Sequence, residues 1–261
     1  MKYSEIKNGD KRSKYVDQND YSSAQIFAAM KENASEAIAA FSTGHAIFKG
    51  LFSNKNTLSD IMLSDPKLIE RKSQNTSNHY TVLLDNLPSW RNFPKRSRSL
   101  ICATKKYIAS GFGDVFLVLP FDGAKIAVCP AADIWAIKFE KLGTSLEIFN
   151  NIMSKYHISD YDYESVITTI LMNRKDILSS TSAEDTLEPT FLAGLAACKN
   201  RNDLISLLND ALNPIPNDFE LTDIFNTPVD ENKEVWTDSK SYLVDIDSSF
   251  YQLILEHCML I

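Results

Sequence analysis

The spacing of apolar residues at the start of the chain predicts two helices on either side of one strand. Behind Ser22, whose side chain is suited to cap a helix, apolar residues recur every three or four positions from 26 to 41, and Gly44 ends the helix that this period predicts. Residues 45 to 51 form a short strand-like run, and residues 56 to 68 again show the period of an amphipathic helix. The opening is therefore expected to be helix, strand, helix.

The next segment mixes irregular and regular stretches. Residues 69 to 98 contain many polar side chains, and we expect them to be partly irregular, with one short helix near 78 to 86. A strand is expected from Ser99 to Thr104, followed by a helical turn from Lys105 to Ser110 that Gly111 ends. Irregular segments of this kind often carry binding residues.

Two pairs of apolar runs are typical of β-hairpins. The runs Val115–Leu119 and Lys125–Cys129 flank a Pro-Phe-Asp-Gly turn. The runs Glu234–Trp236 and Ser241–Ile246 flank a turn around Asp238. Because both runs of the first pair are almost continuously apolar, we expect those two strands to be central in a sheet.

The remaining segments complete an α+β protein. Residues 143 to 213 carry helical stripes of apolar side chains and are expected to be a helical insertion, and a last helix is expected from 248 to 259. Residues 1 to 20 show no period and predict a loosely held arm, whereas the prolines between 214 and 231 indicate a loop. No low-complexity linker interrupts the chain, so the sequence predicts a single domain spanning residues 1 to 261.

Composition indicates an ordinary globular protein. Of the 261 residues, 44% are hydrophobic and 23% are charged, and no apolar run approaches the roughly 20 residues that cross a bilayer. The polar N-terminus lacks the apolar core of a signal peptide, so we expect a cytoplasmic protein that does not bind membranes. The four cysteines are too widely spaced for a metal or redox motif, and we expect them to be reduced and mostly buried: Cys102, Cys129, Cys198 and Cys258.

Charge narrows the range of partners. The net charge of −7 argues against a protein that coats nucleic acid through its overall field. A local basic cluster nevertheless lies within sixteen residues: Arg91, Lys95, Arg96, Arg98, Lys105 and Lys106. This cluster has two interpretations, a solvated loop or a site for a phosphate-bearing ligand.

Several familiar catalytic motifs are missing from the sequence. There is no Walker-type phosphate loop, no GxGxxG, no HExxH and no GxSxG. The four histidines are scattered, at positions 45, 79, 157 and 257, so neither a metal site nor a serine or cysteine triad is favoured. We therefore expect no metal cofactor.

Three segments, in order along the chain, resemble the signature strands of the mono-ADP-ribosyltransferase superfamily: Ile47–Leu51, Ser99–Ala109 and Asn232–Trp236. In that family the first strand carries an aromatic-Arg-Gly pattern, the second carries Ser-Thr-Ser before a helix, and the third carries a Glu two positions after a Gln or Glu. The resemblance implies an ADP-ribosyltransferase-like split β-sandwich with a helical elaboration. It also implies NAD as the substrate.

Within this resemblance, Glu234 takes the place of the catalytic glutamate. NAD breaks at its nicotinamide–ribose bond through an oxocarbenium-like state, and a carboxylate beside the ribose stabilises the developing cation. Thr104 keeps a hydroxyl of the Ser-Thr-Ser strand, and Ser99 on the same strand is a second hydroxyl that would orient Glu234. Cys102 and Ala103 occupy the other two Ser-Thr-Ser positions. Considered alone, Glu234 is also compatible with a solvated carboxylate at a strand end.

Other residues would hold NAD. Lys49 stands at the position of the family's arginine, which contacts the phosphates and ribose, and it supplies a point charge in place of a bidentate fork. Arg71 or Arg96 would supply the fork. His45, on the same strand as Lys49, would play the part that histidine plays in the diphtheria-toxin branch. Arg98 would join Lys49 and Arg96 on the pyrophosphate.

Aromatic side chains are expected to sandwich the nicotinamide, and four lie in the corresponding part of the sequence: Tyr80, Trp90, Phe93 and Tyr107. For each of them taken alone, core packing is the favoured interpretation. Asn232 stands where the family selects its acceptor. Because this residue is not acidic, asparagine, serine, thiol and nucleobase acceptors all remain open.

The resemblance therefore implies a transferase that cleaves NAD and passes ADP-ribose to a macromolecule, either RNA or protein. The family is dominated by toxins and effectors, so a role in conflict between phage and host, with an antitoxin or inhibitor protein as a partner, is expected. One alternative is a catalytically silent module of the same fold that binds a protein or nucleic acid, which Lys49 and the Cys102–Ala103 pair favour. Another is an unrelated α+β interaction protein whose strands are only core.

Overall fold

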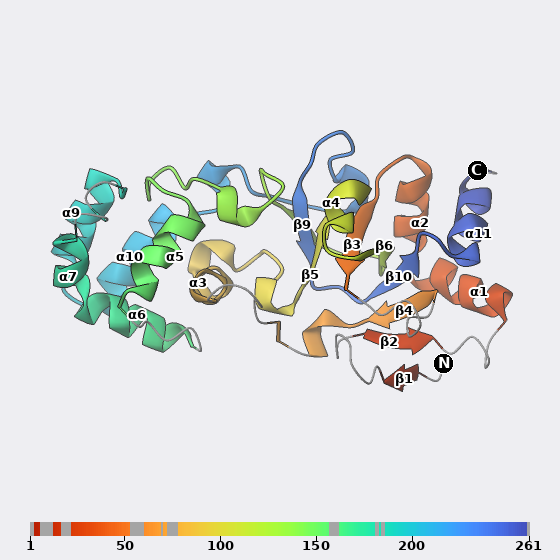
Figure 1. Ribbon diagram of the computed structural model, residues 1–261, viewed down its shortest axis with the longest axis horizontal. Helices are drawn as coiled ribbons and strands as arrows, with labels where there is room; N and C mark the ends of the chain where they lie inside the picture. The colour runs from red at the N-terminus through yellow and green to blue at the C-terminus, as the bar shows by residue number, and fades with distance from the viewer. Residues whose placement is uncertain are drawn as a thin grey trace. The chain divides into compact units, whose positions relative to one another are not determined.

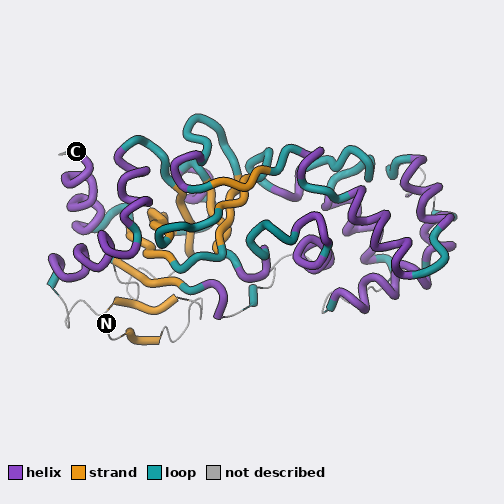
Figure 2. Tube along the Cα trace, turned by 180° about the vertical axis from the view of Figure 1, so that it is seen from behind, coloured by secondary structure: helices purple, strands orange, loops and turns teal. Residues whose placement is uncertain are grey.

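The computed structural model divides the chain into two compact units (Figure 1). The described residues are 3–5, 13–16, 22–52, 60–68, 70–71, 78–156, 162–180, 183 and 186–259. Unit 1 consists of Met1–Glu70, Arg98–Val128 and Leu221–Ile261, and unit 2 consists of Arg71–Ser97 and Cys129–Glu220. Unit 1 forms the sheet, whereas the described part of unit 2 consists mainly of helices and loops (Figure 2).

The sheet contains ten described strands in the order β1-β2-β4-β10-β6-β3-β5-β9-β7-β8. Their bounds are β1 Tyr3–Glu5, β2 Ser13–Val16, β3 Ile47–Leu51, β4 Ile61–Ser64, β5 Leu100–Ala103, β6 Asp114–Pro120, β7 Ile126–Val128, β8 Glu220–Thr222, β9 Glu234–Thr237 and β10 Ser241–Asp245. The strand pairs with an assigned register are antiparallel. β3 and β5 share a single register pair, Phe48 with Ala103, so this joint separates the six strands that end in β3 from the four that begin with β5.

Four helices of unit 1 are described: α1 Ser23–Asn33, α2 Ser35–Ser42, α4 Lys106–Ser110 and α11 Ser249–Cys258. α1 begins with a reciprocal cap in which the Ser22 and Gln25 side chains bond each other's backbone N–H. The sequence predicts one helix here, but the backbone leaves the helical conformation at Ala34 (φ −137°, ψ 37°), so α1 ends and α2 begins anew. α2 and α11 pack on each other and on the sheet, and one continuous apolar core lies between them.

Neither of the two predicted hairpins is formed, although all four of their strands are present. β6 pairs with β3 and β10, and β9 pairs with β5 and β7. The turn after β6 docks on α2 instead: Asp122 accepts hydrogen bonds from the Glu36 backbone N–H (2.9 Å) and the Ser35 hydroxyl (2.7 Å). Because the turn is held there, β7 joins another part of the sheet. The prediction that both strands are central in the sheet is confirmed for β6 and is wrong for β7, which lies next to the edge strand β8.

Two expectations for the N-terminal part of the chain are wrong where the structure describes it. Residues 61 to 64 form β4 instead of helix, because this apolar run is paired on one side with β10 and on the other with β2. Ile61 and Met62 are fully buried there. β1 and β2 pair with each other at the sheet edge, where the sequence predicts a loose arm. Residues 56 to 59, the start of the predicted helix, lie outside the described residues, and at its end Pro66–Leu68 forms a short 3-10 helix.

The described helices of unit 2 are α3 His79–Asn86, α5 Leu146–Ser154, α6 Tyr163–Met172, α7 Arg174–Leu178, α9 Pro189–Ala197 and α10 Arg201–Ala211. The helices predicted near 78 to 86 and from 143 to 213 are confirmed for the described residues, and the mixed content is that of an α+β protein. Trp90 joins the parts of this unit, since its Nε1 donates to the Leu212 carbonyl (2.7 Å) and its ring packs against Phe93 and Phe219. Residues 71 to 97 thus belong to the helical unit.

Candidate functional site

β3, β5 and β9, the strands that carry the three resembling segments, are consecutive neighbours in the sheet (Figure 1). Ala103 at the end of β5 is the register partner of both Phe48 on β3 and Glu234 on β9. Residues that face each other across neighbouring strands point to the same face of a sheet, so Phe48, Ala103 and Glu234 form one row. Glu234 is the first residue of β9 and is only 9% exposed.

Thr104 fastens the backbone that leads into β9. Its N–H donates to the Lys233 carbonyl (3.0 Å). Its hydroxyl donates to the Glu231 carbonyl (2.5 Å) and accepts from the Lys233 N–H (3.0 Å). Thr104 is buried, so these bonds form in a low-dielectric environment. The hydroxyl that the resemblance assigns to orienting Glu234 therefore acts on the backbone just before that residue.

Two further side chains hold the same stretch of backbone, the 227–233 segment. His45 Nδ1 lies 2.9 Å from the Thr227 carbonyl oxygen. A carbonyl oxygen only accepts, so this contact requires a proton on Nδ1. Lys105 Nζ donates to the Val229 carbonyl (2.5 Å). The segment is thus attached both to His45, two residues before β3, and to Lys105 at the start of α4.

The charges of Lys49 and Glu234 both affect the pKa of the same buried thiol, that of Cys102. Lys49 follows Phe48 and points to the other face of β3, where its Nζ donates to the Ile101 carbonyl (3.1 Å). Burial raises the pKa of the Cys102 thiol to about 12, while the Lys49 charge lowers that pKa and the Glu234 charge raises it. Both charges therefore lie close to the end of β5, and Cys102 is an uncharged thiol at neutral pH.

Ser99 and Arg98 lie at the other end of β5. Ser99 is fully buried just before the strand begins, whereas Glu234 pairs with Ala103 at its end. Four residue steps of strand span about 13 Å. The structure therefore does not bring Ser99 to Glu234, and Arg98 is exposed at the same distant end.

Three of the expected NAD-binding residues belong to unit 2. Arg96 is buried, its Nε donates to the Tyr80 hydroxyl (3.4 Å), and its guanidinium lies 5.7 Å from the centre of the Tyr80 ring. The Arg96 backbone N–H donates to Asp85 (2.6 Å), and burial raises the pKa of that carboxyl although hydrogen bonds from Ser97 lower it. The Arg71 N–H donates to the Ser97 carbonyl (2.5 Å). Arg96 and Tyr80 are thus a buried pair inside unit 2.

Of the remaining residues expected to bind NAD or the acceptor, two lie on the surface and two are buried. Tyr107 on α4 is 61% exposed, and Asn232 in the 227–233 segment is also exposed. Trp90 and Phe93 are buried against each other in unit 2, with ring centres 5.1 Å apart. The part of the expected site that belongs to β3, β5, β9 and the segments next to them is His45, Lys49, Thr104, Tyr107, Asn232 and Glu234.

Lys105 has a role that the sequence did not reveal. As a member of the basic cluster, Lys105 is predicted to be either a ligand for phosphate or a solvated charge. Its ammonium instead bonds the Val229 carbonyl, and the ammonium of Lys106 donates to the Tyr251 hydroxyl (2.8 Å). The only signal in the sequence was that Lys105 directly follows Thr104.

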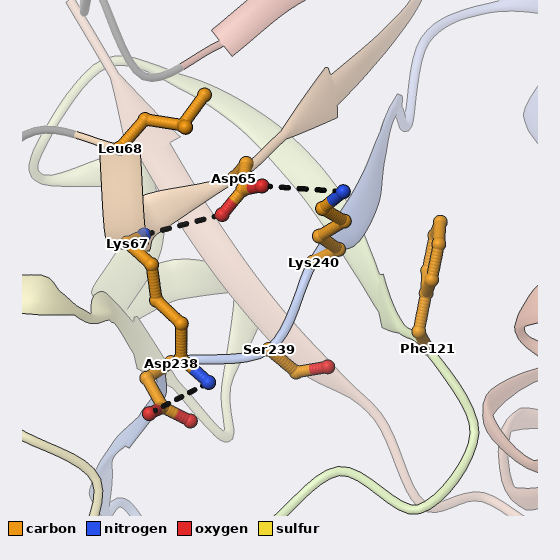
Figure 3. A pocket seen from close by; sticks show the side chains of 7 residues that line it. All are labelled: Asp65, Lys67, Leu68, Phe121, Asp238, Ser239 and Lys240. Carbon is orange, nitrogen blue, oxygen red and sulfur yellow. Dashed lines mark hydrogen bonds and ion pairs between the residues drawn. The ribbon is translucent and has the colours of Figure 1, made fainter.

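A cavity of about 320 Å³ lies in unit 1 beyond the other end of β9 (Figure 3). An ion pair joins Lys67 to Asp238 across it (3.0 Å). A second ion pair joins Lys240 to Asp65 (3.4 Å). The two Asp-x-Lys sequences thus pair crosswise and attach the turn between β9 and β10 to the chain after β4. The cavity is charge-balanced and lies away from Glu234, which begins β9.

Metal sites, membrane spans and known relatives offer no further guide to the chemistry. Within the described part of the chain, no group of three or more His, Cys, Asp or Glu side chains is placed to hold a metal ion. No described helix is long and apolar enough to cross a membrane. The four cysteines are free thiols and three are buried, as predicted. Comparisons with models of protein families, with curated proteins and with solved structures find no match to this chain.

Proposed function

We propose that this chain is an NAD-dependent mono-ADP-ribosyltransferase that breaks the nicotinamide–ribose bond of NAD and passes ADP-ribose to a macromolecule. The observation that carries the proposal is the row Phe48, Ala103 and Glu234 across β3, β5 and β9. Three segments far apart in the sequence, each resembling a signature strand of that family, are neighbours in the sheet. A chance likeness of short segments does not require them to be adjacent.

The joint between β3 and β5 supports the fold that this function requires. With only one register pair, the two strands are held together at a single position, Phe48 with Ala103. A sheet with such a joint can separate into two layers, as in the split β-sandwich of the family. We propose that fold for unit 1, with the helices of unit 2 as its elaboration.

In the proposed reaction, Glu234 stabilises the positive charge that develops on the ribose as nicotinamide leaves. Because Glu234 is buried, water screens its carboxylate weakly and its charge acts strongly at short range. Lys49 has no part in this scheme, because it points to the face of β3 opposite Phe48 and Glu234 and its ammonium donates to the Ile101 carbonyl. Thr104 keeps the backbone before Glu234 in place, which preorganises the carboxylate. NAD is the substrate, and the scheme uses no metal.

The acceptor in this proposal is a macromolecule, RNA or protein. Asn232 is exposed two residues before Glu234, so its side chain is available to an acceptor that approaches the end of β9. An enzyme of this kind would act as a toxin or effector in the cytoplasm, with an antitoxin or inhibitor protein as its partner.

The test is the release of nicotinamide from labelled NAD by wild type, Glu234→Gln and Glu231→Gln, with and without added RNA or lysate protein. Loss of a preorganised charge predicts a fall of about 100-fold or more for Glu234→Gln. Glu231→Gln is the matched control, because that exposed carboxylate pairs with Lys233 (2.9 Å) and is expected to keep release within about twofold. Whichever addition becomes labelled identifies the acceptor class.

Two results would contradict the proposal. Equal release by wild type and Glu234→Gln would remove Glu234 from the chemistry. No release under any condition would leave the catalytically silent binding module as the better reading, because Lys49 and the Cys102–Ala103 pair stand where the family has arginine and hydroxyl residues.

A further inference from the structure

The 227–233 segment is held at every second residue. Its carbonyl oxygens accept hydrogen bonds from three residues outside the segment: Thr227 from His45, Val229 from Lys105, Glu231 from the Thr104 hydroxyl and Lys233 from the Thr104 N–H. Four bonds over seven residues restrain a stretch that has neither helix nor strand. Such restraint is unusual for an irregular surface segment, whose carbonyls ordinarily bond water.

Lys105 reaches the segment from a fixed base. Its backbone lies between the end of β5 and the start of α4, where its carbonyl accepts from the N–H groups of Ile108 and Ala109. The donor it supplies is charged, and charge-assisted hydrogen bonds are about twice as strong as neutral ones. Lys105 therefore contributes a charge-assisted bond at Val229, near the middle of the segment.

The bonds of the segment locate Asn232. The two residues beside it, Glu231 and Lys233, are both bonded to Thr104, while the Asn232 side chain is exposed. The backbone at this position is thus fixed and the side chain is free to meet a macromolecule. A shift of the segment at Val229 would move Asn232 while β9 kept its pairing with β5.

We propose that Lys105 is a positioning residue, which acts through the Val229 carbonyl to hold the 227–233 segment so that Asn232 is presented to the macromolecular acceptor. Lys105 does not contact NAD in this scheme. The acceptor role rests on the proposed transferase function, whereas the anchoring of the segment does not.

Amide hydrogen exchange tests the anchoring without any assay of activity. The reporters are the Lys233 N–H, which donates to the Thr104 hydroxyl, and the Thr104 N–H, which donates to the Lys233 carbonyl. Lys105→Met is expected to speed their exchange about tenfold, and Lys105→Arg to restore it to within about twofold of wild type. Lys106→Met is the matched control, because the ammonium of Lys106 bonds Tyr251 instead of the segment.

Two exchange results would overturn the anchoring: unchanged exchange in Lys105→Met, or an equal increase in Lys106→Met. A thermal melt of each variant shows whether the change is local to the segment or global. Equal destabilisation of all amides in Lys105→Met would also count against a positioning role.

The acceptor role is tested by the labelled acceptor formed per nicotinamide released, using whichever of RNA or lysate protein the wild type labels. Lys105→Met is expected to lower this ratio about fivefold while nicotinamide release stays within about twofold, and Lys105→Arg to restore the ratio. An unchanged ratio would overturn the acceptor role. If wild type releases no nicotinamide, the transferase proposal fails, and the exchange measurement still decides whether Lys105 anchors the segment.

Discussion

Ala103 on β5 lies directly opposite Glu234 on β9, so a single methyl group faces the buried carboxylate to which we assign the proposed chemistry. Facing residues of antiparallel strands have Cβ atoms about 4.5–5.5 Å apart. Ala103 also faces Phe48 on its other side. The size of the side chain at position 103 therefore determines the space around Glu234.

Enlarging this side chain is expected to displace the carboxylate. Ala103→Leu should lower the free energy of unfolding by about 1–3 kcal/mol through overpacking and reduce nicotinamide release at least about tenfold. Ala127→Leu is the control, since Ala127 is fully buried on β7 and faces Trp236. It should cost similar stability and leave release per folded molecule unchanged. Full release by folded Ala103→Leu would place the chemistry elsewhere.

Removing the Thr104 hydroxyl is expected to loosen the entry into β9. Thr104→Val keeps the shape of the side chain but leaves the Lys233 N–H without the hydroxyl that accepts from it, which should cost about 1–3 kcal/mol in the free energy of unfolding. Thr104→Ser keeps the hydroxyl and should cost less than about 1 kcal/mol. Urea unfolding measures both. Equal stability of the two variants would show that the hydroxyl contributes nothing.

Local signals in the sequence predict the elements better than their partners. The period of apolar residues predicts the helices of unit 2, and the turn residues predict the bends. Helices and turns depend on residues that are near one another in the chain. The prediction of the two hairpins is wrong because strand pairing depends on contacts between residues far apart in the chain, such as the bonds of Asp122 with Ser35 and Glu36. The helix predicted where β4 forms is wrong for the same reason, because pairing with β2 and β10 outweighs the helical period of the sequence.

The candidate site shows the same limit. The resemblance groups Thr104 with Glu234, and the structure places the Thr104 hydroxyl on the backbone of Glu231 and Lys233, just before Glu234. It also selected Ser99, which an alternating strand places on the face of Ala103 but about 13 Å away along it. The anchoring by Lys105 depends on a contact with Val229 across 124 positions of the chain, which no local pattern encodes.

The buried thiol of Cys102 predicts a dependence of stability on alkaline pH. Its pKa is about 12 in the folded protein against 9.0 for an ordinary cysteine, so its contribution is fully present below pH 9 and is lost as the pH rises from 9 towards 12. The loss is about 1.4 kcal/mol per pH unit in that window. The Cys102→Ala variant lacks this loss of stability. The other three cysteines are present in both proteins, so their contributions cancel in the difference between wild type and variant.

Urea unfolding of wild type and Cys102→Ala at pH 7, 9, 10 and 11 measures this effect. The stability advantage of wild type at pH 7, where the variant carries a small cavity, should shrink steadily above pH 9. A difference that stays constant from pH 7 to 11 would show that Cys102 is not buried in the folded protein.

Substitutions at Gly113 and Gly123 distinguish the cost of backbone strain from the cost of a steric clash. Both have positive φ, 113° and 75° respectively, which disfavours a side chain by about 1–2 kcal/mol. A Cβ on Gly123 meets nothing within 4 Å, whereas a Cβ on Gly113 overlaps the backbone of Leu51 and Phe52, where β3 ends beside the start of β6. Gly123→Ala is therefore expected to cost about 1–2 kcal/mol and Gly113→Ala more than about 3 kcal/mol. Equal thermal stability of the two variants would mean that β3 and β6 do not meet at this end.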